Sequence, residues 1–279
     1  MPTDWLNLTT HRLDIYDEQL AKTQFLKQFE SLFNTNNSEA SSLNELPTAF
    51  DYIRLGHPLS CVLEWVIGNL NQLDSNNVIS FSSKTIPVLA VLRKNLLENK
   101  NTQIIYTGEL PDFFDVKILR SIYGYTFDLK KVEKGETISE FNGSTIFISQ
   151  QDNICIFDLN PAIDFLINVH ADLGSVLVVN GVQNEGYISE IQHVRRRETI
   201  AMTPANSLTA LKLLIDTSSA QNKNSAIHTV NKTTVLDSIK SITEAHTTAL
   251  VASSGLSIQY AILMGLIHDA QENHVGKAI

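Results

Sequence analysis

The alternation of short apolar runs with helix-like segments constrains the fold of this chain most. Runs rich in β-branched and aromatic residues recur between residues 78 and 179, and segments with apolar residues at helical spacing lie between them. This order is typical of βαβ units, in which helices cover both faces of a mainly parallel sheet. We therefore expect an α/β fold with a doubly wound sheet.

The expected elements follow directly from this pattern, and several of the helices start just after a Pro or a short polar residue, as helix N-termini prefer. Strands are expected at residues 78–81, 103–106, 125–129, 145–149 and 175–179. Helices are expected at residues 59–73, 85–99, 111–123, 161–170 and 205–215.

Two flanking regions differ from this central pattern. Residues 17–33 form an amphipathic helix pattern and residues 34–47 a polar loop, so residues 1–47 are expected to be a helical arm. The α/β domain is expected over 48–216, and the Ser-, Asn- and Thr-rich residues after it predict a linker over 217–240. In 241–279 we expect a strand at 249–252, a Ser-Ser-Gly turn and a helix over 256–270.

Composition limits the partners and the compartment. The net charge of -9 disfavours nucleic acid and anionic membranes, which attract Lys- and Arg-rich surfaces. We see no basic start followed by an apolar signal segment and no apolar run of about 20 residues, so a cytoplasmic protein without a membrane span is expected. Small molecules and other proteins remain as partners.

Metal chemistry lacks support in the sequence. Cys61 and Cys155 lie in apolar stretches outside any Cys/His cluster, so two buried thiols are expected. The histidines are scattered and form no ligand pattern. The dense basic run 193–198 has the charge to bind a phosphate or an acidic partner, but we expect it to be a solvated face. No GxSxG, GxGxxG or phosphate-loop motif occurs.

Four segments carry polar residues in a fixed order along the α/β domain. They are Tyr52-Ile53-Arg54-Leu55-Gly56-His57-Pro58 with Leu63-Glu64 after it, Val78-Ile79-Ser80-Phe81-Ser82-Ser83-Lys84, Ile146-Phe147-Ile148-Ser149-Gln150-Gln151-Asp152-Asn153, and residues 158–181 ending at Asn180-Gly181. Together they resemble the Cys/Met-metabolism family of pyridoxal-phosphate enzymes, which includes cystathionine synthases, cystathionine lyases and methionine γ-lyase.

The resemblance implies a cofactor site, pyridoxal phosphate as its ligand, and the large domain of the fold-type-I enzymes as the fold. Tyr52 and Arg54 would hold the cofactor phosphate in a neighbouring subunit's site. Ser82 and Ser83 would form the phosphate turn, with Lys84 where the family has Gly. Asn153 would contact the ring hydroxyl. Read from the residues alone, Tyr52 and Arg54 are equally a surface or interface pair, and Asn153 a turn-forming side chain.

Besides the phosphate-turn glycine, two further positions on which the family's chemistry depends are changed. Asn180 stands where an Asp pairs with the ring nitrogen, and 202–207 lacks the lysine that forms the Schiff base. Lys212 is the nearest lysine, in an ordinary helical context. A second phosphate turn is implied by Ser253, Ser254 and Gly255, where the glycine is kept, so residues 241–279 resemble the start of a second copy of the domain.

We therefore expect a transferase-like protein of the sulfur amino-acid type that is catalytically impaired. Such a chain would act as a pairing or regulatory domain, as a homo-oligomer or with an active homologous domain. An active enzyme would eliminate or replace a group at the β or γ carbon of an amino acid. The alternative is an unrelated doubly wound α/β protein that binds a small molecule, such as an amino acid or a phosphate.

Overall fold

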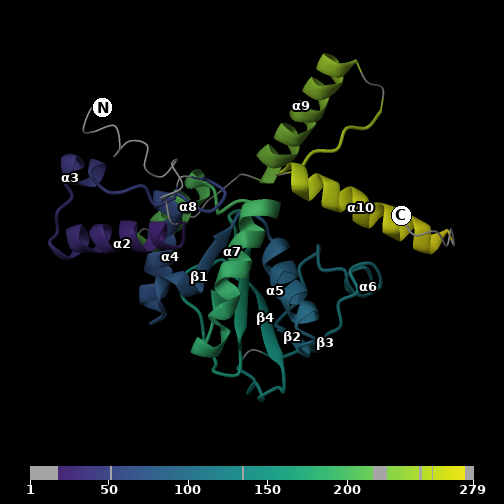
Figure 1. Cartoon of the computed structure of the whole chain (residues 1–279), viewed down its shortest axis with the longest axis horizontal. Coiled ribbons are helices and arrows are strands. Elements are labelled where there is room, and N and C mark those ends of the chain that lie inside the picture. Colours follow the sequence, from purple (N-terminus) through teal and green to yellow (C-terminus); the bar gives the residue numbers. More distant parts are fainter. Residues whose placement is uncertain are drawn as a thin grey trace.

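The chain builds one six-stranded sheet between helical layers, with helical arms at both ends (Figure 1). The computed structural model describes residues 18–50, 52–133, 135–215, 225–244, 247–252 and 254–273. The helices are α2 (Glu18–Asn34), α3 (Ala40–Asn44), α4 (Pro58–Leu70), α5 (Ile86–Leu97), α6 (Val116–Ser121), α7 (Gly186–Glu198), α8 (Pro204–Ile215), α9 (Ser225–Thr243) and α10 (Gly255–Glu272). The strands are β1 (Val78–Phe81), β2 (Thr102–Tyr106), β3 (Asp128–Lys131), β4 (Ser144–Gln150), β5 (Phe165–His170) and β6 (Gly174–Val179).

The sheet is mainly parallel, as the sequence predicts. Its strand order is β1-β6-β5-β4-β2-β3. Only β6 runs against the others, because it pairs antiparallel with both β5 and β1 while β5, β4, β2 and β3 pair in parallel. The carboxyl ends of all strands except β6 therefore meet at one edge, called the carboxyl edge below. The opposite edge is called the amino edge.

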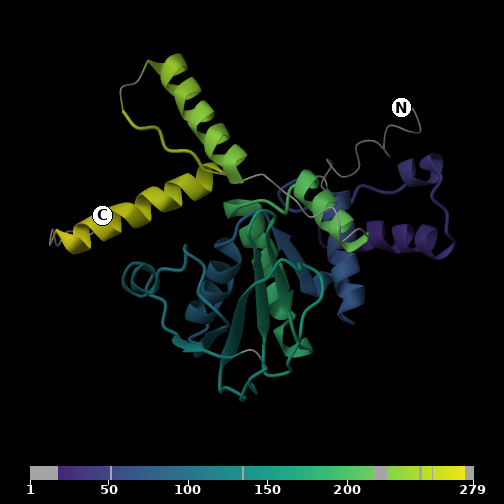
Figure 2. The same cartoon turned by 180° about the vertical axis from the view of Figure 1, so that it is seen from behind.

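Two apolar clusters lie on the two faces of the sheet, because successive side chains of a strand point to opposite faces. Ile79, Ile104 and Ile146 pack beneath α5 and α7, which cross the front of the sheet in Figure 1. Val78, Ile105 and Leu166 pack on the other face against α4 and α8, which Figure 2 shows from behind. Helices thus cover both faces, and the doubly wound prediction is confirmed.

The main error of the sequence prediction concerns β5. Residues 161–170 were expected to be helical, but Phe165–His170 is a strand that is buried along its whole length. An interior strand of a parallel sheet is apolar on both sides, so it shows no period of two and is easily mistaken for a buried helix. The expected strand at 125–129 also shifts to Asp128–Lys131, and α6 is shorter than predicted.

The basic run was also misjudged. It belongs to α7, which the sequence analysis did not predict, and Arg195 within it is fully buried while Glu198 is nearly so. The residues His193 and Arg197 on the same helix are exposed. A helix that buries charged side chains has a weak apolar stripe, which is why periodicity did not reveal it.

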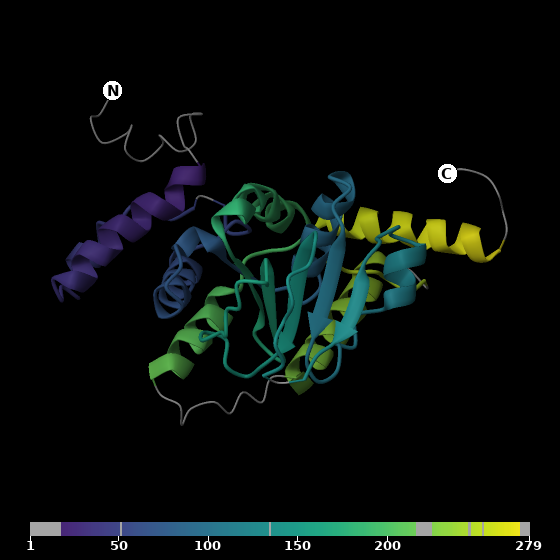
Figure 3. The same cartoon turned by 90° about the horizontal axis from the view of Figure 1, so that it is seen from below.

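The C-terminal region differs from the expected linker and strand. Residues 217–224 lie outside the described part of the chain, and the rest of the expected linker, residues 225–240, belongs to α9. Residues 249–252 do not form a strand, whereas the helix expected after them is α10. Figure 3 places α2 and α10 at opposite ends of the molecule. No described helix is long and apolar enough to cross a bilayer.

Candidate functional site

The carboxyl edge is the first place to look for a site, because ligands of open α/β sheets bind beyond the carboxyl ends of the strands. Ser82 and Ser83 follow β1 at this edge, and Asn153 follows β4. The structure therefore places three of the predicted cofactor residues beyond the same edge. Whether these three residues can bind a cofactor depends on the hydrogen bonds that they already make within the protein.

The turn after β1 uses its polar groups within the chain. Ser83 Oγ accepts hydrogen bonds from the backbone N–H groups of Thr85 at 3.3 Å and Ile86 at 3.1 Å, at the start of α5. Ser83 O accepts one from Ser175 Oγ at 2.6 Å, and Ser82 N donates to Ile200 O at 3.1 Å. The N–H groups that would face a phosphate at a helix start are thus already bound to Ser83.

The β5–β6 turn occupies the space beside this segment. Lys84 Nζ donates to Ala171 O in that turn. Gly174 has φ +115°, and a Cβ there would lie 2.2 Å from Phe81 O, so only glycine allows the close approach of the two segments. Gly174 therefore lets the β5–β6 turn pack closely against the segment that follows β1, where the phosphate cradle was predicted.

Asn153 is a turn residue in this structure. Its Oδ1 accepts hydrogen bonds from Cys155 N at 2.9 Å and Ile156 N at 3.1 Å. Its backbone oxygen accepts from Asn168 Nδ2 at 3.1 Å. This is the Asx-turn arrangement that the sequence left open as the alternative to a ring contact.

Asn180 lies away from the other predicted cofactor residues. It follows β6, the one reversed strand, and so stands at the amino edge. Its Nδ2 donates to Asn160 O at 3.2 Å and Ile163 O at 2.7 Å. The structure does not bring Asn180 together with Ser82, Ser83 or Asn153.

Tyr52 and Arg54 do lie together, on the surface. The Arg54 guanidinium is 5.8 Å from the centre of the Tyr52 ring, and the Arg196 guanidinium is 5.5 Å from the same ring. Tyr52 is 38% exposed. Two guanidinium groups thus lie against one exposed aromatic ring, in keeping with either an anion contact or an interface.

The second predicted phosphate turn is a helix cap. Ser253 lies outside the described residues. Ser254 Oγ accepts a hydrogen bond from Ser257 N at 3.0 Å and donates one to Arg197 O at 2.8 Å, and α10 begins at Gly255. Because no strand leads into this turn, the strand–turn–helix element expected here is not formed. Lys212 is exposed on α8, as its helical context predicts.

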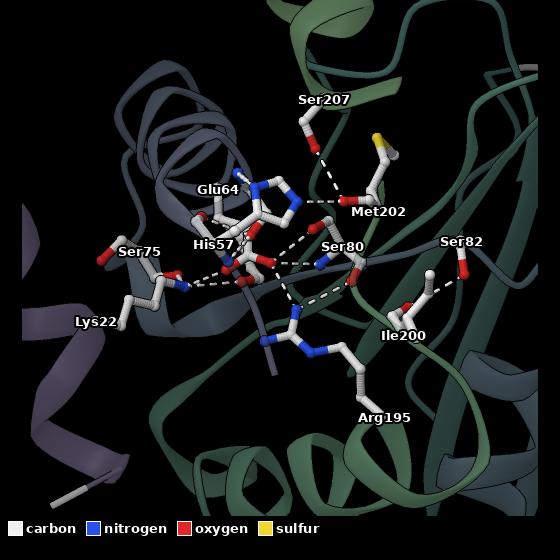
Figure 4. A network of polar contacts seen from close by, with 12 residues as sticks. Lys22, His57, Glu64, Ser75, Ser80, Ser82, Arg195, Ile200, Met202 and Ser207 are labelled. Carbon is white, nitrogen blue, oxygen red and sulfur yellow. Dashed lines mark hydrogen bonds and ion pairs between the residues drawn. The ribbon is translucent and has the colours of Figure 1, made fainter. Parts of the chain in front are cut away.

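A buried ion cluster on the α4 side of the sheet was missed by the sequence analysis (Figure 4). Glu64 on α4 forms ion pairs with Lys22 of α2 at 2.6 Å and with Arg195 of α7 at 2.8 Å. All three side chains are at most 2% exposed. The cluster thus ties the N-terminal arm, the first domain helix and α7 to one carboxylate.

Hydrogen bonds from β1 complete the cluster. Ser80 donates to Glu64 Oε1 from its backbone N at 2.8 Å and from its Oγ at 2.7 Å, and Arg195 Nη1 donates to Ser80 O at 3.0 Å. Burial alone would raise the pKa of Glu64, but Lys22 and Arg195 lower it to about 2. Nε and Nη2 of Arg195 are buried without a hydrogen-bond partner. The signal in the sequence was Glu64 inside an otherwise apolar helix.

His57 joins this region to the segment before α8. Its Nδ1 accepts from Ser60 N at 3.2 Å at the start of α4, so its Nε2 is the atom that donates to Met202 O at 2.8 Å. Burial lowers the pKa of His57, and the ring is neutral near pH 7. His57 therefore positions backbone, and both of its nitrogens are used.

The predicted cofactor residues, where the structure describes them, do not fit pyridoxal phosphate as a covalently held cofactor. The turn that would cradle the phosphate is bound internally, Asn180 is at the far edge, and Lys84 Nζ is bound by the β5–β6 turn.

Burial raises the pKa of Cys61 and of Cys155 to about 12, so neither is a nucleophile near pH 7. Among the described residues, no cluster of His, Cys, Asp and Glu could hold a metal ion.

Comparison with known proteins finds likeness only at the level of structure. No family model matches the chain, and no curated protein matches it. Similar solved structures include a cystathionine gamma-lyase from Lactobacillus plantarum (14% identity, TM-score 0.39, 60% of this chain, 54% of that one). Others are metB from Corynebacterium glutamicum (16%, 0.40, 62% and 55%) and a putative L-allo-threonine aldolase from Listeria monocytogenes (11%, 0.41, 72% and 71%).

The structures found include an enzyme of the kind that the sequence resembles, cystathionine gamma-lyase. The chain spans about half the length of that enzyme and of metB. With TM-scores near 0.4 and identities no higher than 16%, no residue role is carried over from these structures. The roles of the residues rest on the geometry described above.

Proposed function

We propose that this chain is a non-catalytic domain, similar to transferases that use pyridoxal phosphate in sulfur amino-acid metabolism, and that it acts by pairing with another protein chain. The observation that carries the proposal is the internally bound turn after β1, in which Ser83 caps α5 and Lys84 contacts the β5–β6 turn. A cofactor phosphate at this turn would have to displace these hydrogen bonds. A domain of this kind keeps a fold without its chemistry.

Exposed apolar side chains support the pairing part of the proposal. Ile53 beside the Tyr52–Arg54 pair is 58% exposed, and apolar residues of both C-terminal helices are exposed to a similar degree. A partner surface that covers these side chains removes them from water, which favours association. The partner we propose is a second copy of this chain or a homologous domain that is active.

The cofactor part is tested by mixing the purified chain with pyridoxal phosphate, reducing with borohydride and locating adducts by mass spectrometry. We expect no aldimine absorbance band and no adduct enriched on Lys84 or Lys212 over exposed lysines such as Lys117 and Lys27. Lys84→Ala and Lys212→Ala serve as matched controls for each lysine. A stoichiometric adduct on Lys84 or Lys212 that its own variant abolishes would refute the proposal.

The pairing part is tested by sedimentation velocity of the full chain at micromolar concentration. We expect a dimer or larger species, weakened by Ile53→Glu and unaffected by Lys117→Glu on α6. A monomer at all concentrations, alone and with a homologous active enzyme, would contradict pairing.

The alternative function is binding of a small molecule without pyridoxal phosphate. One observation favours it, a large cleft at the amino edge of the sheet. That cleft lies away from the predicted cofactor residues at the carboxyl edge, so both functions are compatible with one chain.

A further inference from the structure

A cleft of about 720 Å³ opens at the amino edge of the sheet, where β2 and β3 begin. Its wall includes Thr102 at the start of β2, Asp128 at the start of β3, and Arg120 of α6. The loop before β4 contributes Glu140 and Phe141. Small-molecule sites have volumes of roughly 300 to 1,000 Å³, so the cleft is large enough for one.

Arg120 is held in place within this cleft. Its Nη2 donates to Phe127 O at 2.8 Å, and its guanidinium lies 4.9 Å from the centre of the Phe127 ring. Arg120 is exposed, and in the described part of the chain no carboxylate forms an ion pair with it. The remaining N–H groups of a fixed guanidinium are suited to a carboxylate or a phosphate.

Two carboxylates share the cleft with Arg120. Asp128 and Glu140 both line it, and neither takes part in an ion pair among the residues described. They also lie beyond ion-pair distance of Arg120 itself, since no such pair is formed. The cleft therefore contains one cationic and two anionic side chains that do not pair with each other. A ligand with both a positive and a negative group can pair with all of them.

The apolar part of the wall comes from aromatic rings. Phe127 is buried beneath Arg120, and Phe141 is half-buried. A Cβ at Gly143 would lie 2.4 Å from Asn101 O and 2.7 Å from the Phe141 ring, so the glycine lets the loop that carries Phe141 approach β2. An aromatic ring beside two carboxylates favours an ammonium group and an apolar body.

We propose that this cleft binds a small zwitterion, which is a molecule with an ammonium group, an apolar body and a carboxylate or phosphate. The anionic group meets the Arg120 guanidinium, the ammonium meets Asp128 and Glu140, and the apolar body lies on Phe141. The inference rests on the charges of the cleft and does not depend on the proposed pairing function.

The test is binding to the full chain, followed by NMR chemical shifts or calorimetry. The probes are L-phenylalanine as the zwitterion, N-acetyl-L-phenylalanine without the cation, L-phenylalanine amide without the anion, and O-phosphoethanolamine as the phosphate zwitterion. We expect a zwitterion to bind at least about tenfold more tightly than both single-charge analogues, as the loss of one charge-assisted contact predicts. Because O-phosphoethanolamine lacks an aromatic body, its affinity relative to that of L-phenylalanine reports the combined effect of the phosphate and of the lost contact with Phe141.

Variants separate the cleft from other surfaces. Arg120→Gln is expected to weaken the zwitterion about tenfold and to leave the cation-only amide unchanged. Asp128→Asn with Glu140→Gln is expected to weaken the zwitterion to a similar degree and to leave the anion-only N-acetyl-L-phenylalanine unchanged. Lys117→Gln on the same helix is the matched control and is expected to change nothing. Equal binding of all probes, absence of binding by both zwitterions, or binding that survives the Arg120 and carboxylate variants would overturn the proposal.

Discussion

The two helical arms of this protein attach to the sheet domain in different ways. The N-terminal arm buries Ala21, Phe25 and Leu26 in an apolar cluster that includes Cys61 of α4, and it inserts Lys22 into the ion cluster around Glu64. The C-terminal arm attaches through Tyr260 and the cap at Ser254, and no residue of α9 between 230 and 243 is buried. The first arm is thus part of the folded domain, whereas the second is held by a few surface contacts.

This difference explains how a chain can carry a strongly anchored region beside a region suited to partners. An arm that shares buried charges with the core unfolds only with the core, because separation would leave a carboxylate without its cations. An arm held by a cap and one aromatic ring opens at low cost. The four predictions below test whether the two arms differ as much as their contacts indicate.

The largest effect is expected from Arg195→Met. This change leaves Glu64 buried with one cation and removes two hydrogen bonds that Nη1 donates, to Glu64 and to Ser80 O. We expect the free energy of unfolding to fall by about 3–5 kcal/mol, measured from urea denaturation. Arg197→Met, an exposed position on the same helix, is the control and is expected to change it by less than about 0.5 kcal/mol.

Lowering the pH is expected to reduce the free energy of unfolding through the same ion cluster. The pKa of Glu64 is about 2 in the folded protein, below its ordinary value of 4.5, so its stabilising contribution is complete above pH 4.5 and is lost as pH falls toward 2. The loss is on the order of 3 kcal/mol. His57 adds a smaller loss that begins near its ordinary pKa of 6.5, because its pKa is also lowered. Stability curves of wild type and Glu64→Gln between pH 6 and 3 should therefore converge. Parallel curves would contradict the assignment.

Lys22→Met tests the N-terminal arm itself. The methionine keeps the apolar stem of the side chain and removes the ammonium, while Arg195 and Ser80 still hold Glu64. We expect about 2–3 kcal/mol of destabilisation, less than for Arg195→Met. Hydrogen exchange should show lost protection both in α2 and in β1, because Lys22 Nζ also contacts Ser75 O and Val78 O. Lys27→Met, exposed on the same helix, is the control. Loss confined to α2 would mean that the arm is not cooperative with the sheet.

Whether the sequence predicted an element depended on how its apolar residues are spaced. Periodicity located α2, α4, α5, α8 and β1 because each has one apolar face or a short β-branched run. It failed for Phe165–His170, which is apolar on both sides, and for α7, whose buried side includes Arg195. Pairing between Lys22, Glu64 and Arg195 could not be read from positions so far apart in sequence. The order of the strands brought these residues together.

The candidate site shows the same limit. The resemblance put Ser82 and Ser83 in a phosphate turn and Asn153 at a ring contact, and the structure has all three beyond the carboxyl edge of the sheet. It could not reveal that Ser83 caps α5, that Asn153 forms a turn, or that the reversed direction of β6 carries Asn180 to the opposite edge. Motifs identify residue types in order, whereas the hydrogen bonds that use up those residues depend on the packing of other segments.

The smallest effect is expected from Ser254→Ala at the base of the C-terminal arm. This change removes the acceptor of Ser257 N and the contact to Arg197 O, which together cost about 1 kcal/mol at a helix start. Because α10 contributes little to the core, we expect the urea midpoint of the sheet domain to stay unchanged while hydrogen exchange in α10 accelerates. Limited proteolysis should then release the C-terminal arm faster through cleavage within residues 218–232. Ser238→Ala on α9, whose Oγ bonds only within its own helix, is the control. A C-terminal arm that resists cleavage, or whose removal unfolds the sheet, would show that both arms are equally part of one domain.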